Sequence, residues 1–219
     1  MDLNQARFNM IEQQIRPWEV LDPQVLALLS TVRREDFVPL AHKALAFVDM
    51  EIPLGTLPHQ VMLAPRVQAR LLQDLAVQKT DKVLDIGTGS GFMAALLAHQ
   101  AASVLSLEID PALAAQAQVN LQRAGVTNVV VRTADGSQGA AADGPFDVIL
   151  ISGSVAEVPA ALLQQLSVGG RLAAIVGDEP MMRATLISRT HDNSWTTTEP
   201  WDCNAPRLSG FIEPSRFKF

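Results

Sequence analysis

Apolar and polar positions divide residues 82–177 into strands and helices that follow one another along the chain. Five apolar runs are short and rich in Val, Leu and Ile, as is typical of strands buried on both faces. They cover residues 82–86, 103–109, 128–134, 146–152 and 171–176. Helical patterns fall between them at residues 92–99, 110–124 and 159–166. Strands that alternate with helices predict a mainly parallel sheet, with ligand bound beyond the carboxyl ends of the strands.

The flanking segments have a different pattern. Helical periodicity covers residues 2–15, 23–32 and 66–76, and two further strand-like runs cover 185–189 and 194–200. Residues 51–65 contain four prolines or glycines and are predicted to be a loop. We therefore expect residues 1–80 to form an N-terminal helical extension with a loop. Residues 81–219 would form the core, and the two parts would pack as one compact unit.

A glycine-dense turn follows the first of the five strands and is the strongest sign of chemistry in the chain. Gly87, Gly89 and Gly91 allow a sharp turn and a close approach of the backbone to a ligand. The next helix would aim its first N–H groups at that ligand. A dinucleotide fingerprint needs a further glycine at position 92, where this chain has Phe92. A nicotinamide oxidoreductase is therefore the least favoured class.

Acidic residues mark the ends of three strands. Asp85 stands two positions before the first glycine, and Glu108 follows it by 23 positions. A carboxylate at that distance, at the end of the second strand, accepts hydrogen bonds from the ribose hydroxyls of an adenosine. The third strand ends at Asp135-Gly136. Carboxylates near the turn favour a ligand that carries positive charge.

The G-x-G-x-G turn with its preceding Asp85 resembles the first motif of class I methyltransferases, which bind S-adenosylmethionine. The resemblance implies a Rossmann-like α/β fold and places the third-strand carboxylate near the adenine edge. The cofactor contacts that it implies are Asp85, Gly87, Thr88, Gly89, Glu108, Ile109, Asp135 and Gly136.

Motifs outside this common part resemble the protein-L-isoaspartate O-methyltransferase family over nearly the whole chain. The stretch VRREDFVP is similar to the family's V-P-R-E-x-F-V, and IPLG is similar to L-P-I-G. The matching stretches are residues 32–39, 52–55, 84–91, 135–136, 145–147, 158–159 and 166–170. The resemblance implies a seven-stranded sheet with an N-terminal helical extension. It also implies methylation of the α-carboxylate of an isoaspartyl residue in damaged protein.

One segment departs from the family. Where the family has Q-T-I-S-x-P, whose Thr and Ser hydroxyls line the reacting centre, this chain has Val61 and Leu63. Leucine cannot hydrogen-bond a substrate carboxylate, so no catalytic residue can be assigned at the family's serine position. Either other groups hold the carboxylate, such as His59 or backbone N–H groups, or the acceptor is less polar. The predicted substrate loop comprises His59, Gln60, Val61, Met62 and Leu63.

Composition limits the partners and the location. The net charge is −6 without a run of Lys or Arg, which argues against nucleic acid as a partner. The longest apolar stretch is well below the roughly 18 residues of a membrane span, and the first ten residues are too polar for a signal peptide. The single cysteine, Cys203, fits a reducing cytoplasm. No group of His, Cys, Asp and Glu has metal-ligand spacing.

Three functions remain open from these patterns. The first is an S-adenosylmethionine-dependent O-methyltransferase of the isoaspartyl type, acting on a peptide or protein and slowed by the substituted loop. The second is the same cofactor chemistry on a less polar small molecule, favoured if Val61, Met62 and Leu63 face the acceptor. The third is a catalytically silent S-adenosylmethionine-binding protein. The sequence leaves the oligomeric state open.

Overall fold

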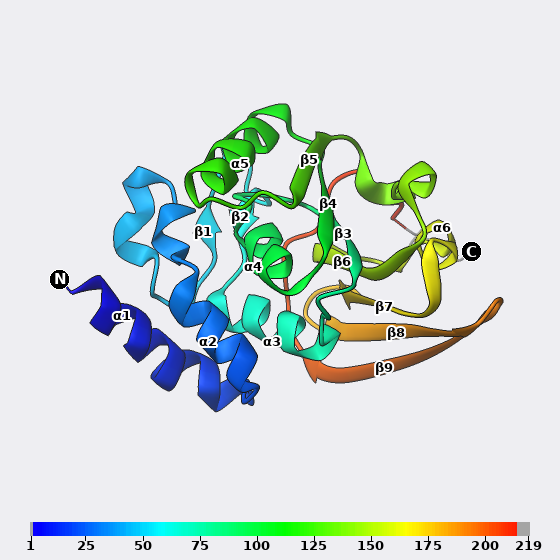
Figure 1. Cartoon of the computed structure of the whole chain (residues 1–219), viewed down its shortest axis with the longest axis horizontal. Coiled ribbons are helices and arrows are strands. Elements are labelled where there is room, and N and C mark those ends of the chain that lie inside the picture. The colour runs from blue at the N-terminus through cyan, green and yellow to red at the C-terminus, as the bar shows by residue number, and fades with distance from the viewer. Residues whose placement is uncertain (1, 214–219) are drawn as a thin grey trace.

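A seven-stranded sheet forms the centre of the protein (Figure 1). The computed structural model describes residues 2–213, so residues 214–219 of the predicted core lie outside the described part. The strand order is β5-β4-β3-β6-β7-β8-β9. The strands are β3 (Lys82–Ile86), β4 (Ser103–Glu108), β5 (Val129–Thr133), β6 (Phe146–Val155), β7 (Leu166–Val176), β8 (Arg183–His191) and β9 (Ser194–Asp202).

The sheet is mainly parallel, which confirms the predicted fold class. The pairs β3–β4, β3–β6, β4–β5 and β6–β7 are parallel, whereas β7–β8 and β8–β9 are antiparallel. The chain builds outward from β3 to β5 on one side and from β6 to β9 on the other. The order therefore reverses between β3 and β6, where an open α/β sheet leaves a crevice at the carboxyl ends of its strands.

Two hydrophobic clusters cover the two faces of the sheet. Side chains alternate along β6, so that Val148 and Leu150 belong to one cluster and Ile149 and Ile151 to the other. The first face is covered by α3 (Pro65–Leu75), α4 (Phe92–Gln100) and the N-terminal helices α1 (Leu3–Met10) and α2 (Pro23–Thr31). The other helices are α5 (Pro111–Arg123) and α6 (Ala160–Gln164). Figure 1 shows α1 and α2 at one end of the molecule and the β8–β9 hairpin at the other.

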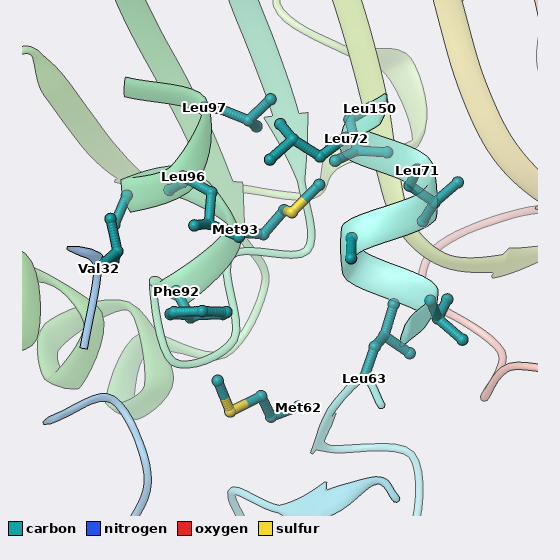
Figure 2. Close-up of a cluster of buried hydrophobic side chains, with 14 of the residues drawn as sticks. Val32, Met62, Leu63, Leu71, Leu72, Phe92, Met93, Leu96, Leu97 and Leu150 are labelled. Carbon is teal, nitrogen blue, oxygen red and sulfur yellow. The ribbon is translucent and has the colours of Figure 1, made fainter. Parts of the chain in front are cut away.

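The N-terminal extension packs directly on the helix that follows the glycine turn. Phe92, at the position where a dinucleotide fingerprint has glycine, is 2% exposed. Its ring meets that of Phe37 edge to face, with centroids 5.5 Å apart. The cluster drawn in Figure 2 combines side chains of both predicted parts, including Val32 and Met62 from the first and Met93 and Leu150 from the second.

Several element boundaries differ from the prediction. The first helix continues past α1 as a π-helical turn (Ile11–Ile15) and a 3-10 turn (Arg16–Trp18), because Pro17 cannot donate the backbone hydrogen bond of an α-helix. The predicted loop at 51–65 contains an antiparallel ladder of β1 (Ile52–Pro53) and β2 (Val61–Met62).

The end of the core also differs. The last core helix is shorter than predicted, because Phe146 pairs with Leu166 and β7 therefore begins five residues before position 171. The last two strands, β8 and β9, are longer than predicted, since their outer residues are polar and carry no apolar alternation. Within residues 2–213, no helix combines the length and the apolar character that crossing a membrane requires.

Candidate active site

The glycine turn joins β3 to α4 at the crevice of the sheet. Gly87 has a φ of 91° and Gly89 a φ of 54°, both in the left-handed region that favours glycine. A Cβ at Gly89 would lie 3.1 Å from Cδ1 of Leu54, so the segment that contains Leu54 packs directly against the backbone of the glycine turn. The N–H groups of Gly87 and Thr88 donate to the carbonyl of Leu107, at 2.8 and 3.2 Å. The turn is therefore fixed to the end of β4.

Glu108, the last residue of β4, has its carboxylate held in place by backbone donors. Its Oε2 accepts a hydrogen bond of 2.8 Å from the N–H of Gly89, and its Oε1 accepts one of 3.1 Å from the N–H of Asp110. Each oxygen has a second lone pair. The carboxylate is thus fixed in orientation at the end of β4 and retains acceptor capacity for a ligand.

Asp85 lies beneath the turn and is completely buried. Its carboxylate accepts hydrogen bonds of 2.7 Å from the hydroxyls of Ser106 and Ser152. Thr88 is 2.6 Å from the hydroxyl of Ser106 and donates to it, because the Ser106 proton is already given to Asp85. Burial raises the pKa of Asp85 to about 6. Asp85 acts on the site through Ser152, which stands in the cavity wall.

The turn and Glu108 open into a cavity of about 690 Å³, counted with the solvent at its mouth. Most of the predicted site residues meet there. The sheet side contributes Gly87, Gly89, Glu108, Ile109 and Gly136, and the predicted substrate loop contributes His59, Gln60, Val61 and Leu63.

A second, smaller cavity of about 350 Å³ adjoins the first and shares Val61, Leu63 and Ser152 with it. Two of the predicted site residues, Met62 and Thr88, line the smaller cavity and not the larger one. Of the predicted cofactor residues, Asp85 and Asp135 line neither of the two cavities. Asp135 lies beside the C-terminal segment. Its Oδ1 accepts a hydrogen bond of 2.9 Å from the N–H of Ser137, and Gly210 lies against its carboxylate.

The substrate loop is fastened across the mouth of the larger cavity. The Gln60 amide donates a 2.7 Å hydrogen bond to Oδ2 of Asp110, which caps α5. The ring nitrogen Nε2 of His59 is 3.2 Å from the hydroxyl of Ser209. Leu63 is 5% exposed and, with Met62, lies among the apolar side chains of α3 and α4 in Figure 2. The family's serine position is therefore occupied by a core side chain that also faces both cavities.

Sequence patterns gave no indication of one wall of the site, which the C-terminal segment supplies. Pro206, Leu208, Ser209 and Phe211 line the larger cavity. The segment pairs with β6, since the N–H of Ser154 donates to Pro206 and the N–H of Leu208 donates to Ser154, both at 2.9 Å. These residues have no periodicity or motif. Ser152 and Gly153 could have been found, because they stand at the carboxyl end of a predicted core strand.

The residues present fit S-adenosylmethionine. Three features surround one crevice. They are the glycine turn, which presents bare backbone, the oriented carboxylate of Glu108, which can accept from a ribose, and Ser152, which is hydrogen-bonded to the buried Asp85. Ile109, Leu113 and Phe211 provide apolar surface for an adenine. When bound, the cofactor supplies a methyl group on a sulfonium. Fold and site together define a class I S-adenosylmethionine-dependent methyltransferase.

Comparisons with known proteins narrow this class. The family model "Protein-L-isoaspartate(D-aspartate) O-methyltransferase (PCMT)" matches residues 5–203. The chain is 42% identical to protein-L-isoaspartate O-methyltransferase 2 of Marinobacter nauticus, with 95% of each chain covered. It is 39% identical to the protein-L-isoaspartate O-methyltransferase of Koribacter versatilis, over 93% of this chain and 90% of the other. The chain belongs to the protein-L-isoaspartate(D-aspartate) O-methyltransferase family.

A solved structure agrees with the fold. A crystal structure from Plasmodium falciparum, described as a protein-L-isoaspartate O-methyltransferase in complex with S-adenosyl-L-homocysteine, superposes with a TM-score of 0.77. The two chains are 18% identical, and the match covers 95% of this chain and 98% of the other.

Proposed function

We propose that this enzyme methylates the α-carboxylate of L-isoaspartyl residues in damaged peptides or proteins. One observation carries the proposal. The loop at residues 59–63, of which residues 60–63 correspond to the family's Q-T-I-S segment, lines the same cavity as the glycine turn and Glu108. An acceptor that enters between loop and turn would meet the cofactor there.

The chain's own contribution to the reaction would be positioning and exclusion of water. A carboxylate oxygen is already anionic at neutral pH, so its methylation needs orientation and desolvation more than a general base. Val61, Leu63 and Leu208 place apolar surface around the crevice. His59 and Ser209 stand together at its mouth, where the loop meets the C-terminal segment.

A label-transfer assay tests the proposal directly. The protein is incubated with S-adenosylmethionine carrying a tritiated methyl group and with an isoaspartyl peptide, and the matching aspartyl peptide serves as control. We expect base-labile label on the isoaspartyl peptide alone. Label on neither peptide, with binding of S-adenosylhomocysteine intact, would contradict the proposed acceptor while leaving the cofactor assignment in place.

A less polar small molecule is the second candidate acceptor. The observation that favours it is the replacement of both family hydroxyls by Val61 and Leu63, whose side chains line the site. Buried apolar walls reject an unpaired carboxylate and accept apolar surface. Transfer of label from the cofactor to a library of hydrophobic carboxylic acids and alcohols, in the absence of peptide, would support this acceptor.

The partners and location that we propose follow from charge and thiol chemistry. Binding to nucleic acid depends on an excess of Lys and Arg, whereas this chain has a net charge of −6. We therefore prefer a peptide or protein acceptor to a nucleic acid. Burial raises the pKa of the Cys203 thiol to about 11, which keeps it protonated and unreactive at neutral pH. A single inert thiol suits a cytoplasmic protein.

A further inference from the structure

Arg34 is a buried cation without an anionic partner. Its side chain is 1% exposed and donates to the carbonyl oxygens of Ala46, at 3.1 Å, and Leu63, at 2.8 Å. Its third acceptor is Oε1 of Gln68, and its guanidinium lies 5.1 Å from the centre of the Phe92 ring. All these groups are neutral. Burial lowers the pKa of Arg34 to about 9, so that the side chain remains charged at neutral pH.

No carboxylate within the described residues 2–213 forms an ion pair with this arginine. Asp49 raises its pKa from a distance but pairs with Arg66. A buried charge without a partner is costly, and proteins retain one mainly where something else balances it. The surroundings of Arg34 therefore favour an anion.

Gln68 lies between Arg34 and the smaller cavity, and its amide contacts both. A guanidinium can only donate hydrogen bonds, so the amide oxygen of Gln68 must face Arg34 and its NH₂ group must face away. Gln68 is 5% exposed, lines the smaller cavity and makes no hydrogen bond through Nε2 within the described part of the chain. Two N–H donors, polarised by a buried cation, are thus available at the cavity.

The hydroxyls of the same cavity are mostly committed elsewhere. Ser152 gives its proton to Asp85, and Thr88 gives its proton to Ser106. Ser90 is the remaining hydroxyl in the wall, next to the first residues of α4, where the helix dipole also favours an anion. Val61 and Leu63 contribute no donor from their side chains.

We infer that the smaller cavity is a carboxylate-binding subsite, in which the Gln68 amide donates to the carboxylate and Arg34 supplies the balancing charge. The subsite would provide the donor that the loop lost when its hydroxyls became Val61 and Leu63. Two carboxylates can reach it, because both cavities meet at Gly87 and Ser152. One is the amino-acid end of the cofactor, and the other is the acceptor carboxylate. Only the second source rests on the proposed function.

Gln68→Glu is the sharpest variant. It keeps the shape of the side chain and an oxygen for Arg34, but it replaces the two N–H donors by a negative charge. We expect thermal stability to stay equal or to rise, since Arg34 gains an ionic partner, while affinity for a carboxylate falls about tenfold to a hundredfold. A residue with a purely structural role would show no such opposite changes. Gln73→Glu is the matched control, because Gln73 lies on the same helix and bonds to Glu19 and Leu21 instead.

Calorimetry with two nucleosides separates the sources of the carboxylate. S-adenosylhomocysteine carries the amino-acid carboxylate, and 5′-methylthioadenosine lacks it. If Gln68→Glu weakens only the first ligand, the subsite holds the cofactor carboxylate. If both nucleosides bind as before and the affinity for isoaspartyl peptide, measured with S-adenosylhomocysteine present, falls at least about tenfold, the subsite holds the acceptor. Unchanged binding of S-adenosylhomocysteine, without a loss of peptide affinity relative to wild type, overturns the proposal. The nucleoside measurements need no turnover, so they stand even if isoaspartyl methylation fails.

Discussion

Glu108 is held by the backbone at both oxygens and still has lone pairs directed at the cavity. Removing its carboxylate should therefore affect the ligand more than the fold. We expect Glu108→Ala to weaken S-adenosylhomocysteine binding by about 1.5–3 kcal/mol, because hydrogen bonds to a charged acceptor are lost. Titration calorimetry measures the change. Glu157→Ala, on the loop after β6, is the control and should bind as wild type. An unchanged affinity in Glu108→Ala would refute the role of Glu108 in ribose binding.

Asp85 makes stability depend on pH in a direction opposite to most carboxylates. Burial raises its pKa from 3.8 to about 6, so the folded protein binds the proton more tightly than the unfolded chain does. Its stabilising contribution is fully present below pH 4 and is lost as the pH rises to about 6. A shift of this size corresponds to about 3 kcal/mol.

Asp85→Asn should remove this dependence. Relative to the wild type, the variant should gain unfolding free energy as the pH rises from 4 to 7, since the amide has no charge to bury. Denaturant unfolding of both proteins across this range gives the difference. A constant difference between the two curves would show that Asp85 titrates normally.

Some residues of the candidate site could be predicted from the sequence, and others could not. Glycine spacing and acidic strand ends identified Gly87, Gly89 and Glu108, because a parallel sheet brings the carboxyl ends of its strands to one edge. Arg34 and Gln68 could not be identified in this way. Their significance depends on what surrounds them after folding, and an arginine in VRRED looks like any surface charge in the sequence.

Among the elements, the substrate loop between β1 and α3 carries the main departure from the family. We expect the double substitution Val61→Thr and Leu63→Ser to raise kcat/KM for an isoaspartyl peptide, since a hydroxyl bonded to a carboxylate contributes about 1.5–3 kcal/mol. The gain should come with a loss of stability. Leu63 is 5% exposed in the core, and such truncations cost about 2–5 kcal/mol.

Steady-state kinetics and thermal melts of the double variant and of each single variant separate the two effects. The single variant Val61→Thr adds a hydroxyl and nearly preserves the size of the side chain, so it shows the effect of a hydroxyl without a change in packing volume. Isoaspartyl activity that is high in the wild type and unaffected by the double variant would show that other donors hold the carboxylate.

Elements with strong patterns were predicted more accurately than those without. The core strands β3, β4 and β6 follow from runs of apolar residues that only a doubly covered sheet can bury. The β1–β2 ladder is two residues long on each side and is made by tertiary packing rather than by local preference. The early start of β7 likewise follows from its pairing with Phe146, which no local pattern reports.

At the scale of the whole molecule, one hydrophobic cluster joins the N-terminal extension to the sheet. The extension and the core should therefore unfold together. We expect scanning calorimetry to give a single transition whose calorimetric and van't Hoff enthalpies agree. Phe37→Ala, which removes the ring packed on Phe92, should lower the midpoint by several degrees without splitting the transition. Two resolved transitions would show that residues 1–80 and 81–219 fold as separate domains.

The pairing of residues 206–208 with the end of β6 has a consequence for synthesis of the protein. Ser154 binds a partner more than fifty positions later in the chain, so a ribosome translating at about 5–20 residues per second completes β6 several seconds before it completes the wall that closes the cavity. A nascent chain that has already folded its central strands cannot yet retain the nucleoside. Ligand-dependent protection from proteolysis should therefore appear only in stalled chains whose residues 206–211 have left the exit tunnel.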